Sequence, residues 1–253
     1  MVAGAEGRII GPMAGLRYLH SGFVAGAATL AVQYLHAAVT VDVNPQTFEG
    51  RTSAAIAEFR AAVALDADVA HGRELFAACA ECHRADGSGS ADGTIPVIAG
   101  QHVSVLVKQL VDFRHDRRWH AKMQDAATRH ELASPQDLLD VAAYAASLKR
   151  PAPSALGSGD GAEVHRGQLV YYRDCEGCHG RLAEGDLRTL RPRLAGQHYE
   201  YLLRQLNETA SGQRPGMDEM HVTRIRALSD DERAAVAAHL ARLSPGFSPA
   251  GPP

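Results

Sequence analysis

All four cysteines of the chain lie in two short motifs, each followed at once by a histidine. In a C-x-x-C-H motif, each thiol can form a thioether with one vinyl group of a haem, and the histidine can ligate the iron. A structural zinc site built from all four cysteines is the main alternative. Two copies, each with its own histidine, favour haem. The sequence therefore predicts two covalently bound haem c groups, attached at Cys79, Cys82, Cys175 and Cys178, with His83 and His179 as iron ligands.

Methionines are candidates for the sixth iron ligand, which raises the reduction potential when it is a thioether. Met123 follows the first motif, and Met217 and Met220 follow the second. Counting from each motif and back from the last helix favours Met123 and Met220, with Met217 in reserve. Packing in the core is the alternative role for these methionines. Histidine ligands are a further alternative, at His115, His120, His130 or His221.

Pro96 and Pro192 follow their motifs at the same distance. A proline in a loop can simply rigidify a turn. The functional interpretation is that its carbonyl accepts the N–H of the motif histidine, which fixes the imidazole ring and raises its basicity as a ligand.

The segments that contain the two motifs are copies of each other, so the chain contains an internal duplication. The run Ala-Gly-Gln-His ends at His102 and again at His198, and Gln109-Leu110 matches Gln205-Leu206 at the same offset. Repeats of this length indicate two tandem domains. A stretch rich in Pro, Gly and Ser separates them and has the composition of a linker.

The spacing of apolar residues predicts an all-α fold with the same helices in each repeat. One helix runs into each motif, over 71–78 and 164–174, another starts near His102 and His198, and a last one starts at Ser134 and Ser229. The predicted layout is a cytoplasmic leader (1–20), a membrane anchor or signal segment (21–41), a connecting segment (42–68), a first domain (69–150), a linker (151–161) and a second domain (162–253).

The stretch from Ser21 to Val41 contains no charged residue and is long enough to span a bilayer as a helix. Arginines precede it and acids follow it, which places the N-terminus in the cytoplasm. A cleaved signal peptide and a buried or interfacial helix are the alternatives. Because covalent haem attachment in bacteria occurs outside the cytoplasmic membrane, we expect the periplasmic side of the inner membrane, with a soluble periplasmic protein if the segment is cleaved.

The formal net charge of −3 gives no indication of nucleic-acid binding. Basic residues nevertheless cluster at Arg114, Arg117, Arg118 and Lys122, and at Arg188, Arg191 and Arg193. A solvated face with partners for the haem propionates is the favoured interpretation. Docking of an acidic redox partner is the alternative.

The ordered pattern of C-x-x-C-H, Pro-x-x-Ala-Gly-Gln-His, (Lys/Arg)-Gln-Leu, a methionine loop and a Ser-capped helix, present twice, resembles the dihaem cytochromes of the cytochrome c4 class. The resemblance covers the chain from about His71 onward. It implies two tandem class I cytochrome c domains about a pseudo-twofold axis, with the haems close to the interface and both irons His/Met-ligated. The N-terminal hydrophobic segment departs from that pattern and suggests a membrane-anchored variant or a subunit of a larger assembly.

The resemblance also implies a carrier of single electrons between respiratory or photosynthetic membrane complexes, such as a quinol-oxidising complex and a terminal oxidase. The alternatives are the haem subunit of a multisubunit dehydrogenase or oxidase and, less favoured, a dihaem peroxidase. A peroxidase needs an open iron site with acid–base groups beside it, and a methionine candidate in each repeat argues against one. No constellation for binding a small-molecule substrate is apparent.

Overall fold

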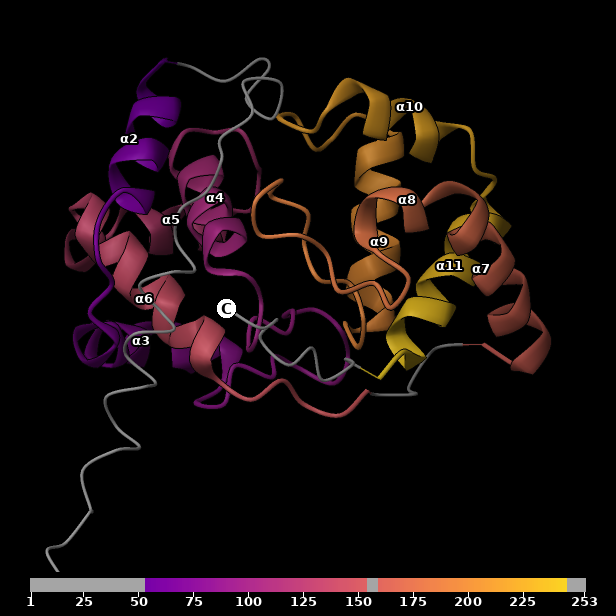
Figure 1. The fold of residues 1–253 in the computed structure, drawn as a ribbon, viewed down its shortest axis with the longest axis horizontal. Helices are drawn as coiled ribbons and strands as arrows, with labels where there is room; N and C mark the ends of the chain where they lie inside the picture. Colours follow the sequence, from indigo (N-terminus) through magenta and orange to yellow (C-terminus); the bar gives the residue numbers. More distant parts are fainter. Residues whose placement is uncertain (1–52, 154–158, 245–253) are drawn as a thin grey trace, which may run out of the picture.

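The computed structural model describes residues 53–153 and 159–244, which fold into two helical groups that lie side by side (Figure 1). Within these ranges the structure contains no β-strand, as the sequence predicted, and only an isolated bridge between Asp186 and Arg191. Residues 21–41, the expected membrane or signal segment, lie outside the described residues. None of the described helices is long and apolar enough to cross a bilayer.

The first group contains α2 (Ser53–Val63), α3 (Val69–His83), α4 (Val103–Arg114), α5 (Ala121–Thr128), the short 3-10 helix η2 (His130–Leu132) and α6 (Pro135–Ser147). The second contains α7 (Gly161–Asp174), α8 (Glu176–His179), α9 (Tyr199–Ala210), α10 (Glu219–Arg226) and α11 (Asp230–Arg242). Helix α2 belongs to the first group, because Phe59 is buried in the same core as Val111 and Leu138.

In each group, the helix that leads into the C-x-x-C-H motif crosses the last helix: α3 crosses α6, and α7 crosses α11. A glycine at each crossing lets the backbones touch: a Cβ on Gly72 would collide with the carbonyl of Asp140, and one on Gly167 with that of Ala235. Aromatic rings pack one turn further along α3, where Phe76 and Tyr144 are in edge contact with centroids 5.1 Å apart. The crossing holds the C-terminal end of α3, and therefore the first motif, in place.

Side-chain caps fix where the last helices begin. Ser134 and Asp137 form a reciprocal capping box at the start of α6, and Ser229 and Glu232 form one at the start of α11. Such boxes satisfy backbone N–H groups that have no partner within the helix. Both starts were predicted from the sequence.

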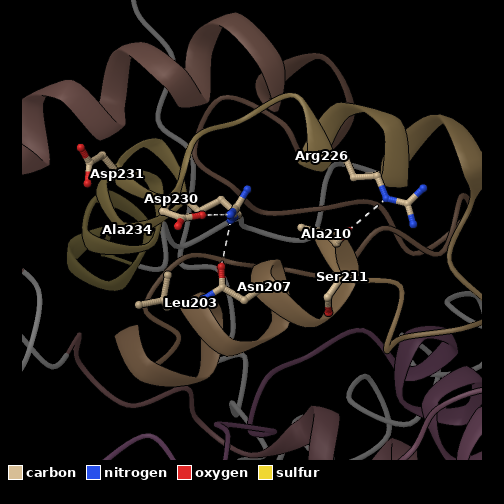
Figure 2. Close-up of a pocket in the computed structure, with 9 residues that line it drawn as sticks. Leu203, Asn207, Ala210, Ser211, Arg226, Asp230, Asp231 and Ala234 are labelled. Atoms are coloured by element: carbon tan, nitrogen blue, oxygen red, sulfur yellow. Dashed lines mark hydrogen bonds and ion pairs between the residues drawn. The ribbon is translucent and has the colours of Figure 1, made fainter.

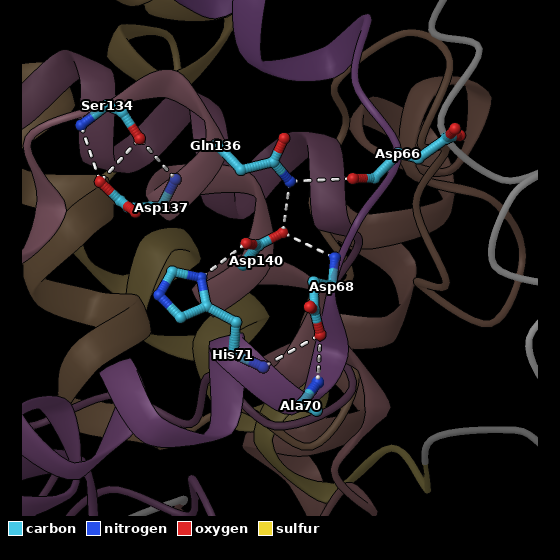
Figure 3. A network of polar contacts seen from close by, with 8 residues as sticks. All are labelled: Asp66, Asp68, Ala70, His71, Ser134, Gln136, Asp137 and Asp140. Carbon is cyan, nitrogen blue, oxygen red and sulfur yellow. Dashed lines mark hydrogen bonds and ion pairs between the residues drawn. The ribbon is translucent and has the colours of Figure 1, made fainter.

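The first group contains a buried carboxylate that has no counterpart in the second. Asp140 is 1 % exposed and accepts hydrogen bonds from the Asp68 backbone N–H, from Gln136 and from Nδ1 of His71 (Figure 3). Ala235 occupies the matching place at the crossing of α7 with α11. Asp140 therefore ties α6 to the loop that precedes α3 only in the first domain.

The repeated Ala-Gly-Gln-His run forms the contact between the domains. Gln197 accepts from the Val97 N–H at 2.9 Å and donates to the Val97 carbonyl at 2.8 Å. Gln101 makes the same pair of hydrogen bonds with Arg193, both at 2.9 Å. Each glutamine thus hydrogen-bonds the backbone of the residue that follows Pro96 or Pro192 in the other domain. The interface therefore has approximate twofold symmetry.

The histidines of the same runs extend this symmetry. Nε2 of His102 lies 2.8 Å from the Glu184 carbonyl, and Nε2 of His198 lies 2.8 Å from the Ser88 carbonyl. Both acceptors belong to the loop that follows the opposite motif. The interface therefore links each domain to the segment that positions the other domain's motif histidine.

Candidate haem-binding sites

The first motif lies at the C-terminal end of α3. Cys79 is half-buried and Cys82 is exposed, and both are free thiols. Residues three apart in a helix lie on one face, so both sulfurs are available to a single ligand. His83 is buried, and its Nδ1 lies 3.1 Å from the Pro96 carbonyl oxygen. A carbonyl can only accept, so Nδ1 carries the proton and Nε2 is left with the lone pair that binds a metal.

The second motif repeats this geometry with different local structure. Helix α7 ends at Asp174, and the motif continues as the single turn α8. Cys175 is half-buried, Cys178 is exposed, and both are free thiols. Nδ1 of the buried His179 lies 3.2 Å from the Pro192 carbonyl oxygen. Both histidines are thus held in the same tautomer by the predicted prolines.

Burial sets the protonation of these groups. It lowers the pKa of His83 and of His179, while the hydrogen bonds to the proline carbonyls act in the opposite direction. The neutral imidazole that results is the form that ligates metals. Burial also raises the pKa of the Cys79 and Cys175 thiols to about 11. Reactive redox dithiols have a lowered pKa, so these motifs do not have the electrostatics of a disulfide exchanger.

The zinc alternative is not supported by the arrangement of the cysteines, all four of which are described. Across residues 53–153 and 159–244, no three side chains of His, Cys, Asp or Glu are placed to hold one metal ion. The two motifs are therefore separate sites, each with two thiols and one imidazole, which is the donor set of a covalently attached haem.

The candidate sixth ligands differ between the domains. Met123 is half-buried in α5. In the second domain Met217 is half-buried before α10, whereas Met220 on α10 is 64 % exposed. His221, beside Met220, has its ring centroid 6.1 Å from that of His179. Met123 and Met220 therefore stay predictions.

Two of the alternative histidines are placed elsewhere. Nε2 of His115 lies 2.8 Å from a carboxylate oxygen of Glu58 in α2, so this histidine joins α2 to α4. The side chain of His130 is 91 % exposed. His120 is exposed too, but it lies near enough to His83 for its charge to lower the pKa of that histidine.

The basic residues singled out in the sequence divide into two kinds. Arg114 forms an ion pair with Glu58 and donates to the carbonyls of Ala127 and Leu132, so it braces the first domain. In Arg193, by contrast, the buried Nε has no hydrogen-bond partner, and in Arg150 the same is true of the buried Nη2. Buried guanidinium nitrogens without acceptors fit a ligand that carries carboxylates, as haem does through its propionates.

The pocket between α9 and α11 has no comparable chemistry (Figure 2). Four of its polar side chains have partners within the pocket: Arg233 binds Asp230 and Asn207, and Arg226 donates to the Ala210 carbonyl. It also lacks cysteine and histidine. The two motif sites are the better candidates for function.

Comparison with known proteins identifies two matching domains. The cytochrome c family matches residues 69–149 and 164–244. The chain is 32% identical to "Cytochrome c4" of Azotobacter vinelandii over 192 residues, which cover 70% of this chain and 89% of that protein. It is also 32% identical, over 198 residues, to the "Thiosulfate dehydrogenase electron acceptor" of Stutzerimonas stutzeri, covering 72% of this chain and 90% of that protein. The crystal structure of reduced cytochrome c4 from Pseudomonas stutzeri superposes with a TM-score of 0.62 at 27% identity, covering 70% of this chain and 99% of that one.

Proposed function

This chain belongs to the cytochrome c family, as a dihaem electron-transfer protein of the cytochrome c4 class with two covalently bound haem c groups, and we propose that it shuttles single electrons between redox proteins on the periplasmic side of the bacterial inner membrane. The observation that carries the proposal is the paired geometry of the motifs. In both, a buried imidazole is held by a proline carbonyl beside two free thiols.

The residues divide the work of each site. Cys79 and Cys82 would hold the first haem, and Cys175 and Cys178 would hold the second, through thioether bonds. The Pro96 and Pro192 carbonyls accept the Nδ1–H of His83 and His179, orient the rings and keep Nε2 available as a ligand. Met123 and Met220 would complete the two iron sites. When bound, haem would supply a one-electron couple whose potential depends on its ligands.

Counting haem in paired cysteine variants tests this assignment. The wild-type chain should carry two covalent haems in a pyridine haemochrome assay. Cys79→Ser with Cys82→Ser should carry one, and so should Cys175→Ser with Cys178→Ser. A chain that has no covalent haem stain and binds zinc would refute the proposed sites.

One relative supports a second candidate partner, a dehydrogenase. The relative from Stutzerimonas stutzeri is named as an electron acceptor of thiosulfate dehydrogenase. We therefore carry, beside a quinol-oxidising complex and a terminal oxidase, a second candidate role as the electron acceptor of an enzyme that oxidises a small sulfur compound. Stopped-flow reduction of the isolated oxidised protein by each donor discriminates the roles, because the physiological donor should reduce it in a saturable, salt-dependent step.

The N-terminal segment decides how the protein is held. We propose that residues 21–41 anchor it in the membrane, with everything after Asp42 outside the cytoplasm. A haem-stained denaturing gel of membrane and soluble fractions tests this. An anchored protein gives a band of full chain mass in the membrane fraction, whereas a cleaved signal gives a lighter soluble band.

A further inference from the structure

Helix α10 turns His221, and not Met220, toward the interior of the second domain. Asp218 caps this helix, and its side chain accepts from the His221 backbone N–H at 3.0 Å, which fixes the first turn. Ile225 lies four residues after His221 and therefore on the same face of the helix. It is 4 % exposed and belongs to the core of the second domain, whereas Met220 is 64 % exposed. The inward face of α10 therefore contains the histidine.

The spacing of two imidazole rings fits one metal ion between them. The ring centroids of His179 and His221 are 6.1 Å apart, and the ring planes are tilted by 54°. A metal–imidazole bond is about 2 Å long and the nitrogen is about 1 Å from the ring centre, so two imidazoles on opposite sides of one metal have centres about 6 Å apart. Rings joined by a direct hydrogen bond would have centres about 1 Å closer, because their nitrogens are then about 3 Å apart. The observed spacing matches a shared metal ion.

Hydrogen bonding leaves a nitrogen available on each of these rings. Nδ1 of His179 lies 3.2 Å from the Pro192 carbonyl oxygen, so Nε2 keeps its lone pair for a ligand. Nδ1 of His221 is buried and has no hydrogen-bond partner among the described residues. A buried polar atom without a partner is uncommon, because nothing replaces its lost contact with water. A metal ion at the second site would give the imidazole of His221 a partner.

The first domain has an acid where the second has this histidine. At the offset that matches Leu132 with Leu228, Asp125 stands opposite His221. The side chain of Asp125 is 75 % exposed, so it does not face the first site. His120, which precedes α5, is exposed as well. An inward-facing imidazole beside the methionine candidate is therefore a feature of the second site.

We propose that His221 is a ligand of the second iron and competes there with Met220. The inference rests on the proposed haem sites. Because adjacent helical residues point about 100° apart, exchange of the two ligands requires the first turn of α10 to rotate. A thioether ligand raises the reduction potential, whereas an imidazole favours the ferric state. The ligand in place therefore sets the potential of the second haem, while the first haem keeps its own.

Removing both methionines of the second site isolates the histidine. In the full chain with Met217→Leu and Met220→Leu, the ferric second haem should stay six-coordinate and low spin. Adding His221→Leu should make one haem per chain high spin and open to cyanide, at concentrations that leave the methionine-free chain unchanged. His165→Leu is the matched control, because it removes an exposed histidine of α7 and should leave the haem closed. A second haem that becomes high spin and binds cyanide once the methionines are gone would overturn the proposal.

Spectroelectrochemical titration of the single variant His221→Leu keeps the test decisive where the methionine-free chain fails to accumulate. Without the competing imidazole, the reduction equilibrium constant of one haem should rise by about twofold to tenfold, where tenfold corresponds to about 59 mV for a one-electron couple. The potential of the other haem should not change. A variant that holds two covalent haems at wild-type potentials would overturn the competition, whereas a protein without covalent haem would instead refute the proposed function.

Discussion

Replacing Gly72 by alanine should destabilise the first domain strongly, although alanine is the better helix former. Gly72 lies within α3, and a Cβ there would collide with the backbone carbonyl of Asp140 in α6. The obstacle is backbone, so it cannot rotate away, and the helices must separate. Separation would also loosen the contact between Phe76 and Tyr144.

The magnitude follows from two opposing terms. Overpacking of this kind costs about 3 kcal/mol at the upper end of its usual range, and the higher helix propensity of alanine returns about 1 kcal/mol. A net loss of about 2 kcal/mol should lower the midpoint of thermal unfolding by roughly 8–16 °C for a domain of this size. Urea unfolding followed by helical circular dichroism measures the same loss as a lower midpoint with an unchanged slope.

Gly161→Ala is the matched control. Gly161 begins α7, and nothing lies within 4 Å of where its Cβ would be. Alanine there should stabilise the second domain slightly, through the same propensity term. If Gly72→Ala unfolds at the wild-type urea concentration, the close backbone contact between α3 and α6 does not limit stability and the reasoning is refuted.

Three further predictions concern charge, the interface and ligation. The hydrogen bond to Asp140, and then the charge of that residue, raise the pKa of His71 against its own desolvation. The stability that protonated His71 contributes should therefore be complete below pH 6.5 and be lost as the pH rises through the raised pKa. His71→Gln should abolish this pH dependence of the urea midpoint. Gln197→Leu should lower the free energy of unfolding by about 1–3 kcal/mol, because it leaves the buried N–H and carbonyl of Val97 unpaired. A control substitution that changes side-chain volume without breaking these hydrogen bonds, and that destabilises the protein equally, would show that only volume mattered. Met220→Leu should remove the thioether–iron charge-transfer absorption of one haem and lower one potential, and unchanged spectra would exclude Met220 as a ligand.

Local chemistry explains which features the sequence could predict. The C-x-x-C-H motif contains its own ligands in consecutive positions, so no knowledge of the fold is needed to find Cys79, Cys82 and His83. Helix starts at Ser134 and Ser229 were predictable for the same reason, since a cap acts within three residues. The contact of His83 with the Pro96 carbonyl spans a longer loop, and the equal spacing of the prolines after both motifs was the signal for it.

Contacts between distant elements were not predictable in this way. Gly72 and Gly167 look like ordinary helix glycines until the crossing helices are in place. The repeated Gln-His pair is visible in the sequence as part of the duplication, but its reciprocal hydrogen bonds between the domains depend on how the two copies face each other. The sixth ligand of the second haem is a harder case. Met220 and His221 are adjacent on a helix, so their side chains point about 100° apart, and the sequence cannot tell which one faces His179.

The interface also shows why two similar domains need not behave alike. Arg150 donates from Nε to the Ala195 carbonyl and from Nη1 to the Ala99 carbonyl, which are equivalent positions in the two Ala-Gly-Gln-His runs. A single arginine from the first domain therefore lies on the pseudo-twofold axis, and one side chain cannot be symmetric about it. Tyr201 adds a second asymmetry, because Val105 stands at the equivalent position of the first repeat. Two haems bound at the motif sites would consequently experience unequal fields, and unequal potentials would give a single electron a preferred domain in which to reside.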